Sequence, residues 1–343
     1  MIDSFPNERR MHCETGALVN TMEYYGWNIS ESMAFGIGSG LYFLYFPWVK
    51  VNDSEMLVMR TRPLYIIRRF SKRMHLGYHE ESFGSNREKA QKALDELVAK
   101  NIPVGLVVNV MDMRFLNDVG MTSNFNGHNM TVIGKEGDQY IIADTDQKLP
   151  NDDYVRLDEV RLKHSRFRSG LGAPHGRMYY FDAMPEGFSG QLDLKSGIIG
   201  GLKETCKNML GIPFPFFGCK GIRFCAKDMR KWEDKYSPKQ IKDKLYWYYT
   251  LLEQGGTGGA GYRFIFADFL KEAAELFNDD SLLKCSEYIV KAADCWRYFT
   301  LGITRNIKGS GYGIREIADF VDEAAEYEKK TFLTIKNDFL KNK

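Results

Sequence analysis

The sequence predicts an α+β N-terminal domain over residues 1–185, followed by an all-helical domain over residues 190–343. Helical and strand signals alternate in the first half of the chain, whereas only helical periodicity follows residue 190. The segment Pro185–Gly190 is rich in turn-forming residues and separates the two regions. A chain of 343 residues is also long enough for two domains of ordinary size.

The first half is expected to combine helices with an antiparallel hairpin. Its first helix has an apolar face and is followed by Gly26, and its second helix can be capped by Ser85. A valine-rich run then predicts a buried strand, and the turn composition of Lys135–Asp138 predicts a hairpin. The predicted elements are a helix over Glu14–Tyr25, a helix over Ser85–Lys100, and strands over Pro103–Val110, His128–Gly134, Gln139–Ala143 and Arg177–Phe181.

The second half shows helical periodicity throughout, interrupted by Pro213, Pro215 and the glycine-rich run Gly255–Gly261. We expect this run to be a mobile loop that covers a cleft or accommodates substrate. The predicted helices are Leu192–Leu210, Pro238–Leu252, Tyr262–Phe277, Ser281–Tyr298 and Ile314–Lys341.

Composition excludes several classes of function. With 47 basic and 45 acidic side chains the net charge is only +2, so no nucleic-acid partner is expected. No stretch reaches the roughly 20 apolar residues of a membrane span, and the charged segment Met1–Arg10 does not resemble a secretory signal. The six cysteines lack the spacing of a zinc ribbon or a disulfide scaffold. We therefore expect a cytoplasmic protein.

Cys13 is the first candidate for chemistry because it lies immediately before the first predicted helix. Its sulfur would face unpaired backbone N–H groups and the positive end of the helix dipole, which favours the nucleophilic thiolate. A lone cysteine at such a place is also compatible with a small buried side chain of purely structural role.

His128 and Asp144 supply the partners that a nucleophilic cysteine needs. His128 opens one strand of the predicted hairpin, and Asp144 ends the other. Because a hairpin returns its second strand to the start of the first, the carboxylate can orient the imidazole. The order Cys13, His128, Asp144 therefore predicts a nucleophile, a base and an orienting group.

Two sets of motifs resemble known families. The sequence His12-Cys13-Glu14-Thr15-Gly16-Ala17, with Tyr25-Gly26 and Phe35-Gly36-Ile37-Gly38-Ser39-Gly40-Leu41, resembles the N-terminal domain of the butirosin biosynthesis acyltransferase family. The resemblance covers about residues 10–182. The arrangement of Gly127, His128, Tyr140 and Asp144 is similar to bacteriocin-processing cysteine peptidases of the papain superfamily. The C-terminal half resembles the helical domain that often follows the first of these.

These resemblances imply a papain-like cysteine fold and an amide-forming acyltransferase in a specialised-metabolite or lipid-amide pathway. Cys13 would take an acyl or aminoacyl group as a thioester from an acyl carrier protein, or another thioester donor, and pass it to a small amine. The papain-like oxyanion-hole position, six residues upstream, is Asn7. No cofactor is implied. Two alternatives stay open: a cysteine peptidase or amidase with the same triad, and a non-catalytic binding protein on this fold.

Several further residues are candidates for substrate binding. His12 is a second possible base, placed behind His128 and treated as a substrate-side or structural residue, and Gly38 and Gly40 suggest a glycine-rich turn that lines a cleft. Arg263, just after the glycine-rich run, could meet a phosphate. His75 and His79 would share a face only if residues 71–81 were helical, so we expect no metal site. The basic residues Arg60, Arg62, Arg68, Arg69, Lys72 and Arg73 could dock an acidic carrier protein.

Overall fold

The computed structural model describes residues 2–113, 125–145, 154–184 and 194–343. They form two compact units. The first comprises Met1–Ala34 and Pro63–Asp193, and the second comprises Phe35–Arg62 and Leu194–Lys343. The predicted boundary segment Pro185–Gly190 lies outside the described residues. An α+β region followed by a helical region is confirmed as the fold class.

The first unit is built on a six-stranded antiparallel sheet with the strand order β3-β8-β4-β5-β6-β7. The predicted hairpin is confirmed, since β5 pairs with β6 across the turn at Gly137, whose φ is +61°. Val108 of β4 pairs with His128 of β5, so the histidine begins a central strand. The strands are β3 (Tyr78–Glu81), β4 (Val104–Val108), β5 (His128–Glu136), β6 (Gln139–Ala143), β7 (Val155–Asp158) and β8 (Met178–Phe181).

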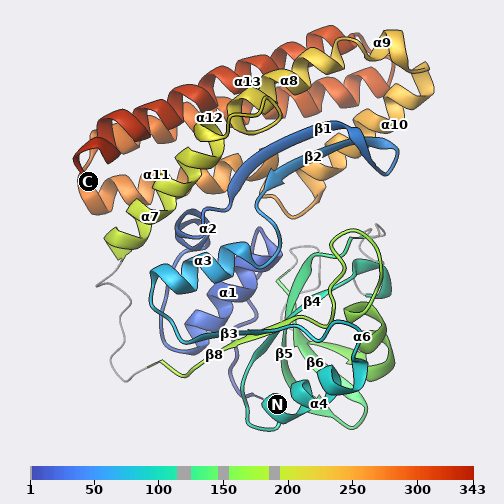
Figure 1. Ribbon diagram of the computed structural model, residues 1–343, viewed down its shortest axis with the longest axis vertical. Coiled ribbons are helices and arrows are strands. Elements are labelled where there is room, and N and C mark those ends of the chain that lie inside the picture. The colour runs from blue at the N-terminus through green and yellow to red at the C-terminus, as the bar shows by residue number, and fades with distance from the viewer. Residues whose placement is uncertain (1, 114–124, 146–153, 185–193) are drawn as a thin grey trace. The chain divides into compact units, whose positions relative to one another are not determined.

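Helices cover both faces of this sheet (Figure 1). On one side lie α1 (Cys13–Tyr24) and α3 (Tyr65–Arg73), and on the other lie α4 (Arg87–Val98) and α6 (Glu159–Arg166). On the α4 and α6 side, buried side chains of the two helices meet alternate residues of the strands in an apolar core: Leu94, Leu162, Met130, Val132 and Ile142. Burial of such side chains is the main stabilising contribution.

The helix predicted over Ser85–Lys100 is confirmed as α4, although its N-cap is Asn86 and not Ser85. The Asn86 side chain accepts a hydrogen bond from the Lys89 amide at 3.0 Å. Serine and asparagine both cap helices, and Asn86 directly follows Ser85 in the chain. In the first unit the sequence prediction missed α3, α6, β3 and β7, which are all short.

The second unit combines a β-hairpin from the N-terminal half of the chain with a set of helices. The hairpin, β1 (Leu41–Val51) and β2 (Ser54–Arg60), packs against α8, where the Tyr45 hydroxyl donates to Asp228 at 2.7 Å. The expected first domain, residues 1–185, therefore differs from the structure over residues 35–62. The aromatic side chains of β1 explain the difference, because they need the apolar surface of the helices.

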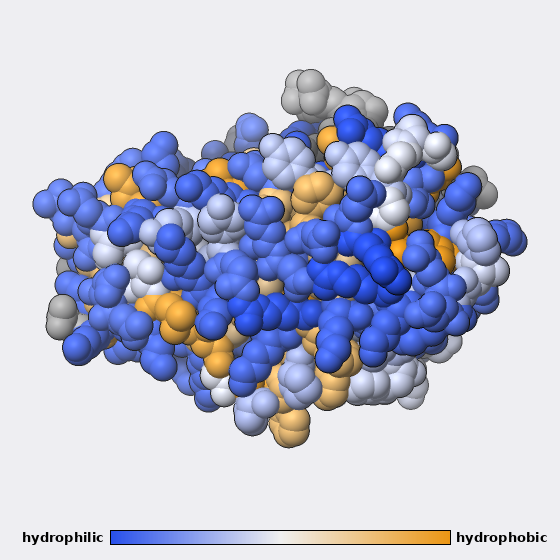
Figure 2. All heavy atoms as spheres, turned by 90° about the horizontal axis from the view of Figure 1, so that it is seen from above, coloured by the Kyte–Doolittle hydropathy of each residue, from blue (hydrophilic) through white to orange (hydrophobic). Residues whose placement is uncertain are grey.

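The helices of the second unit are α7 (Leu194–Cys206), α8 (Gly218–Met229), α9 (Trp232–Lys235), α10 (Pro238–Tyr249), α11 (Arg263–Phe277), α12 (Asp280–Ile307) and α13 (Ile314–Thr334). Helix α12 packs against α11 and α13, and α13 also packs against α8. The face of the molecule in Figure 2 is mostly hydrophilic, as expected for amphipathic helices that bury one side. No helix in the described ranges is long and apolar enough to cross a membrane.

Candidate active site

Cys13 is the first residue of α1 and is half-buried. The amides of the first helical turn have no acceptor within the helix, so the sulfur lies beside backbone donors and the positive end of the dipole. The placement predicted from the sequence is therefore correct. The other five cysteines are buried in the second unit, and burial raises the pKa of those thiols: Cys206, Cys219, Cys225, Cys285 and Cys295.

His128 and Asp144 form a buried pair at the end of the hairpin. The imidazole Nε2 lies 2.6 Å from Asp144 Oδ2, and both side chains are almost wholly buried. The Cys13 thiol also acts on the His128 ring, through a side-chain hydrogen bond and its charge. The three predicted side chains are thus connected in the order thiol, imidazole, carboxylate.

The pair changes the protonation of the imidazole. Burial alone lowers the pKa of His128, but the charge of Asp144 and the hydrogen bonds to Asp144 and Cys13 outweigh burial and raise it well above 6.5. A histidine with this pKa can accept the thiol proton and hold it as an imidazolium. It can later return the proton to a leaving group.

Close packing of α1 on the end of β6 brings the thiol to this pair. A Cβ at Gly16 would lie 2.7 Å from Thr145 Oγ1, so only glycine allows this approach. The Arg10 amide donates to the Thr145 carbonyl at 3.0 Å, and Arg9 Nη1 donates to the Asp144 carbonyl at 2.7 Å. The segment before the cysteine is therefore fixed to the residues that follow β6.

A polar network anchors the chain that enters β5. The Asn109 side chain donates to Asn126 Oδ1 at 2.5 Å, and the Ser165 hydroxyl donates to the Asn109 carbonyl at 2.6 Å. The Asn126 amide donates in turn to the carbonyls of Ser169 and Leu171. All three polar side chains are buried, and Asn126 lies two residues before the histidine. The network fixes where β5 begins.

Two carboxylates flank the nucleophile, the fully buried Glu14 and the half-buried Glu31, and the sequence analysis did not single out either one. Glu14 Oε1 accepts the Ile66 and Ile67 amides at 3.0 and 3.3 Å, which ties α1 to the first turn of α3. Glu31, at the start of α2 (Glu31–Ile37), binds the turn that precedes Cys13. An acidic residue beside a candidate nucleophile was the available signal, but its partners are distant in the sequence.

A buried tyrosine lies in the same region. Burial raises the pKa of the Tyr179 hydroxyl, and the charges of Glu14 and Cys13 add to the shift. The ring packs on Gly105 of the neighbouring strand, where a Cβ would lie 2.0 Å from Tyr179 Cζ. Among the residues that the structure describes, its hydroxyl has no hydrogen-bond partner.

His12 lies at the start of α1. It occupies the N-cap position of α1, is buried, and its Nδ1 lies 3.1 Å from Thr15 Oγ1. Asn7, the candidate for the oxyanion hole, is half-buried in the segment before α1. Its role as a donor stays a prediction.

Gly38 and Gly40 belong to the second unit, and both are buried there. A Cβ at Gly40 would lie 2.4 Å from the Phe35 ring, and one at Gly36 would lie 2.1 Å from the Phe269 ring. The Ser39 hydroxyl donates to the Gly201 carbonyl at 3.0 Å. This glycine pattern is therefore accounted for by close packing of the chain against α7 and α11.

Arg263 does not offer a charge to a phosphate, which corrects the prediction. The side chain is fully buried, and Nε and Nη2 bind the two oxygens of Glu328 at 2.9 and 3.0 Å. Nη1 donates to the Gly261 carbonyl at 2.7 Å, and the guanidinium lies over the Trp296 ring at 5.6 Å. The sequence showed the residue but not its carboxylate partner on α13.

The glycine-rich run also differs from the expected mobile loop. Thr257 and Gly259 are buried, and the Thr257 hydroxyl donates to the Leu252 carbonyl and accepts from the Gly259 amide. Left-handed backbone angles recur through the segment, at Gly256, Gly258, Gly259, Ala260, Gly261 and Tyr262. Glycine adopts these backbone angles without a steric clash, which explains why the tightly turned segment is rich in glycine.

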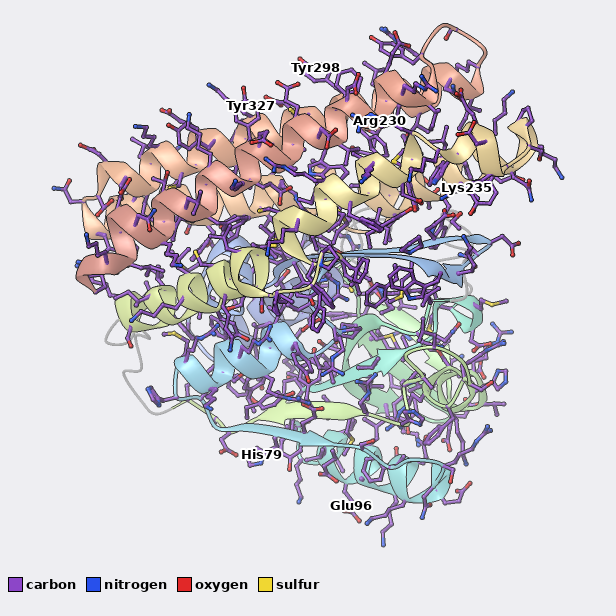
Figure 3. All side chains as sticks on the ribbon, turned by 45° about the horizontal axis from the view of Figure 1, so that its top comes forward. His79, Glu96, Arg230, Lys235, Tyr298 and Tyr327 are labelled. Carbon is purple, nitrogen blue, oxygen red and sulfur yellow. The ribbon has the colours of Figure 1, made fainter. Side chains whose placement is uncertain are left out.

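The two histidines considered for a metal do not lie on one helix. Helix α3 ends at Arg73, His75 has a left-handed φ of +53°, and His79 lies in β3. His79 is exposed and binds Asp182 at 2.8 Å (Figure 3). Across the described ranges, no group of His, Cys, Asp and Glu side chains could hold a metal ion.

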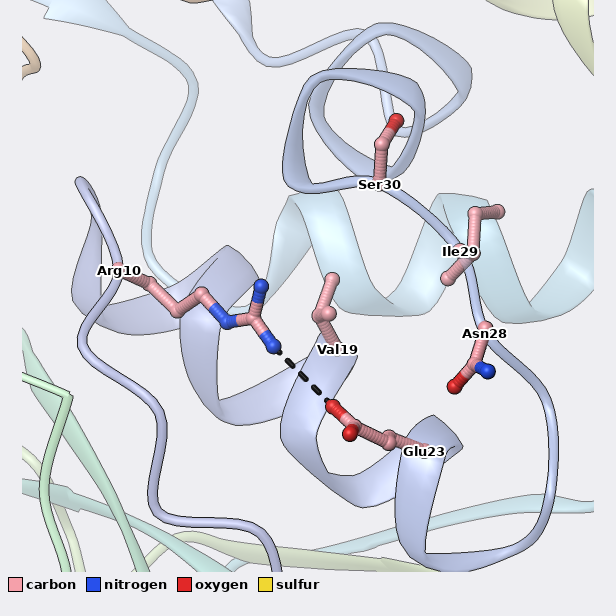
Figure 4. A pocket seen from close by; sticks show the side chains of 6 residues that line it. All are labelled: Arg10, Val19, Glu23, Asn28, Ile29 and Ser30. Atoms are coloured by element: carbon pink, nitrogen blue, oxygen red, sulfur yellow. Dashed lines mark hydrogen bonds and ion pairs between the residues drawn. The ribbon is translucent and has the colours of Figure 1, made fainter. Parts of the chain in front are cut away.

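A polar pocket of about 330 Å³ lies along α1 (Figure 4). The Arg10 guanidinium and the Glu23 carboxylate form an ion pair at 3.1 Å on one side of it. Asn28, Ile29 and Ser30 line another side. Val19 lies six residues after Cys13, or about 9 Å along the helix axis, so the pocket is separate from the thiol.

Comparison with known proteins agrees with the resemblance found in the motifs. Residues 12–145 match the family described as butirosin biosynthesis protein H, N-terminal. Residues 160–335 match a family described as a domain of unknown function, DUF4872. No curated protein matches the chain. A protein from Bacillus anthracis, described as a C39-like peptidase, is similar in structure at 13% identity and a TM-score of 0.34, over 53% of this chain and 96% of that chain.

Proposed function

We propose that this chain, which belongs to the DUF4872 family and begins with a region of the butirosin biosynthesis protein H type, is a papain-like cysteine acyltransferase. The observation that carries the proposal is the connected set of Cys13, His128 and Asp144. The nucleophile is half-buried, whereas the base and its orienting carboxylate are buried. A protected base beside a reachable thiol is suited to covalent catalysis.

The first half-reaction loads the enzyme. His128 Nδ1 accepts the thiol proton, and the Cys13 sulfur attacks the carbonyl carbon of an acyl thioester. The tetrahedral intermediate collapses as the carbon–sulfur bond of the donor breaks, and the imidazolium returns the proton to the departing thiol. The products are acyl-Cys13 and the free donor thiol. The raised pKa of His128 supports its role as proton carrier in this step.

Backbone donors at the start of α1 support the tetrahedral intermediate. The Cys13 amide belongs to the first helical turn, which has no acceptor inside the helix, so it can donate to the developing oxyanion. Asn7 is the candidate for the second donor. Removing one such donor typically costs about 10²–10³ in rate.

The second half-reaction distinguishes a transferase from a hydrolase. An amine attacks acyl-Cys13, His128 removes its proton, and the sulfur leaves as the amide forms. Positioning of the amine can outcompete water, because effective molarities reach about 10⁵ M or more. The name of the matching N-terminal family refers to biosynthesis, which favours synthesis over hydrolysis. The motif resemblance to butirosin biosynthesis acyltransferases implies an acyl carrier protein as the donor and an amine as the acceptor. A cysteine peptidase or amidase remains the second candidate, because the same three residues would serve water as acceptor.

The test is intact-protein mass spectrometry after exposure to acyl-pantetheine thioesters, with and without small amines. We expect the wild type to gain one acyl mass at Cys13 and to keep it until an amine is supplied, when the amide is released. The Cys13→Ala protein should gain no mass. Rapid release of free acid that added amines do not change would favour the hydrolase. The absence of any adduct with donors of several chain lengths would refute covalent catalysis.

A further inference from the structure

The turn that precedes Cys13 is held by a single carboxylate from another helix. Glu31 Oε2 accepts the Met11 amide at 2.8 Å, and Oε1 accepts the His12 amide at 2.8 Å. Oε1 also accepts the Thr15 hydroxyl at 2.8 Å. Glu31 therefore binds the two residues before the nucleophile and the residue two positions after it.

These contacts differ from ordinary helix capping. A capping side chain accepts amides from the second or third helical residue, whereas Glu31 accepts amides that lie before the helix begins. The Thr15 hydroxyl also approaches the His12 ring, with 3.1 Å between Oγ1 and Nδ1. Backbone and side chains on both sides of Cys13 thus share one anchor, and its two oxygens fix the orientation of consecutive peptide units.

Activation by charge does not explain this carboxylate. A negative group near the start of α1 opposes formation of the Cys13 thiolate, so its electrostatic effect would reduce reactivity. Burial also carries a cost, because it raises the pKa of Glu31 against the opposing hydrogen bonds of Met11, Thr15 and His12 and the charge of Arg10. The benefit that remains is geometric.

We propose that Glu31 is a positioning residue for the Cys13 nucleophile, holding the turn so that the sulfur stays within reach of His128. The inference rests on the proposed function and deepens it. Reacting groups need placement finer than about 1 Å, and an error of that size can cost about 10² in rate. Glu31 supplies this constraint through two backbone amides and one hydroxyl, and none of these three groups reacts in the proposed chemistry.

The main test replaces Glu31 with glutamine. Glutamine keeps the size of the side chain but has only one acceptor oxygen, whereas the donors in the wild type bind both oxygens of the carboxylate. We expect Glu31→Gln to lower kcat for acyl loading by about 10- to 100-fold and to leave KM within about threefold. Alkylation of Cys13 by iodoacetamide should also slow near neutral pH, although the removed negative charge would by itself speed it. Glu96→Gln is the control, since Glu96 is exposed on α4 and pairs with Lys92 of the same helix, and it should alkylate like the wild type.

A second pair of variants keeps the test decisive if Glu31→Gln does not fold. Thr15→Val removes the hydroxyl that donates a hydrogen bond to Glu31, whereas Thr15→Ser retains it. We expect Thr15→Val to slow alkylation and Thr15→Ser to restore it. Unchanged or faster alkylation in Glu31→Gln and Thr15→Val would overturn the positioning role. Alkylation by iodoacetamide needs no acyl donor, so it tests the positioning role even if the wild-type protein forms no acyl-enzyme. Failure of the wild type to form an acyl-enzyme would instead overturn the proposed function.

Discussion

Each unit of the molecule buries an ion pair at a residue that the sequence analysis selected, yet only one pair adjoins a reactive group. In the first unit, His128 and Asp144 are buried at 2.6 Å, and the histidine also contacts the half-buried Cys13. In the second unit, Arg263 and Glu328 are buried at 2.9 Å. There the remaining donors of the guanidinium bind a carbonyl, and the carboxylate also accepts the Trp296 indole N–H.

The difference shows what separates a reactive pair from a structural one. Both pairs bear the cost of desolvation, and both repay it with short, well-directed hydrogen bonds. The two side chains of the pair around Arg263 are fully buried and bind other groups of the fold, so solvent and ligands do not reach them. The pair around His128 leaves one ring nitrogen for a sulfur that solvent can reach. The candidate active site is marked by the accessible sulfur beside the buried pair, and not by the buried charge itself.

The largest effect on acyl loading should come from removing the Cys13 sulfur. Cys13→Ala should reduce acyl loading by at least about 10³-fold, because loss of the nucleophile in a triad leaves only binding and backbone donors. Stability should change little, since the thiol is half-buried. Mass spectrometry of acylated protein measures the first effect and urea unfolding the second. Continued acylation at another cysteine would contradict the assignment.

Breaking the other pair should affect stability and not chemistry. Arg263→Met leaves Glu328 as a buried carboxylate without its partner, which typically costs about 3–5 kcal/mol. The double variant Arg263→Met with Glu328→Leu should recover much of this loss. Urea unfolding of the four proteins in a double-mutant cycle measures the coupling. Additive losses in the two single variants would show that the pair is not coupled.

Weakening the pair of His128 and Asp144 without removing it should shift the pH dependence of acyl loading. In the wild type, His128 has a raised pKa, so its contribution to stability is fully present below about pH 6.5 and is lost as the pH rises through the folded pKa. In Asp144→Asn the effect of burial dominates and lowers that pKa. We expect the alkaline limb of the loading rate to shift to lower pH, with kcat reduced by about 10². The pH profile of acyl loading measures this, and an unchanged alkaline limb would exclude His128 as the proton carrier.

The smallest effect is expected at Tyr179. Its buried hydroxyl has no hydrogen-bond partner among the described residues, so Tyr179→Phe removes a polar group that burial penalises. We expect the free energy of unfolding to stay the same or to rise by up to about 1 kcal/mol. Urea unfolding with Tyr179→Leu as control is the measurement, because leucine also loses the ring that packs on Gly105. A large loss of stability in Tyr179→Phe would reveal a partner for the hydroxyl.

The elements that sequence reasoning predicted well are those with strong local signals. The helix after Cys13 is followed by Gly26, whose φ is +87°, and the hairpin of β5 and β6 has a polar turn between two apolar strands. Because the hairpin fixes the distance from His128 to Asp144, the pair itself followed from local pattern. The contact with Cys13 then required only that α1 pack on this sheet.

What the sequence analysis missed depends on partners far along the chain. Nothing near Arg263 indicates Glu328, which lies 65 residues away, and nothing near Glu14 indicates the amides that it binds in α3. The hairpin β1 and β2 lies in the N-terminal half but packs with helices that begin after residue 194. In the sequence, a charged residue of an amphipathic segment gives the same pattern whether its side chain lies in solvent or in a buried ion pair.

The tightly turned segment around Gly255–Gly261 has a practical consequence for protein engineering. Glycine-rich stretches usually invite insertion of a tag or new termini, but here left-handed angles extend to Ala260 at +51° and Tyr262 at +72°, and the Arg263 side chain binds the Gly261 carbonyl. The turn between α12 and α13 is different: Gly309 and Gly311 are exposed, and an added Cβ would meet no atom within 4 Å. An inserted tag belongs in that turn.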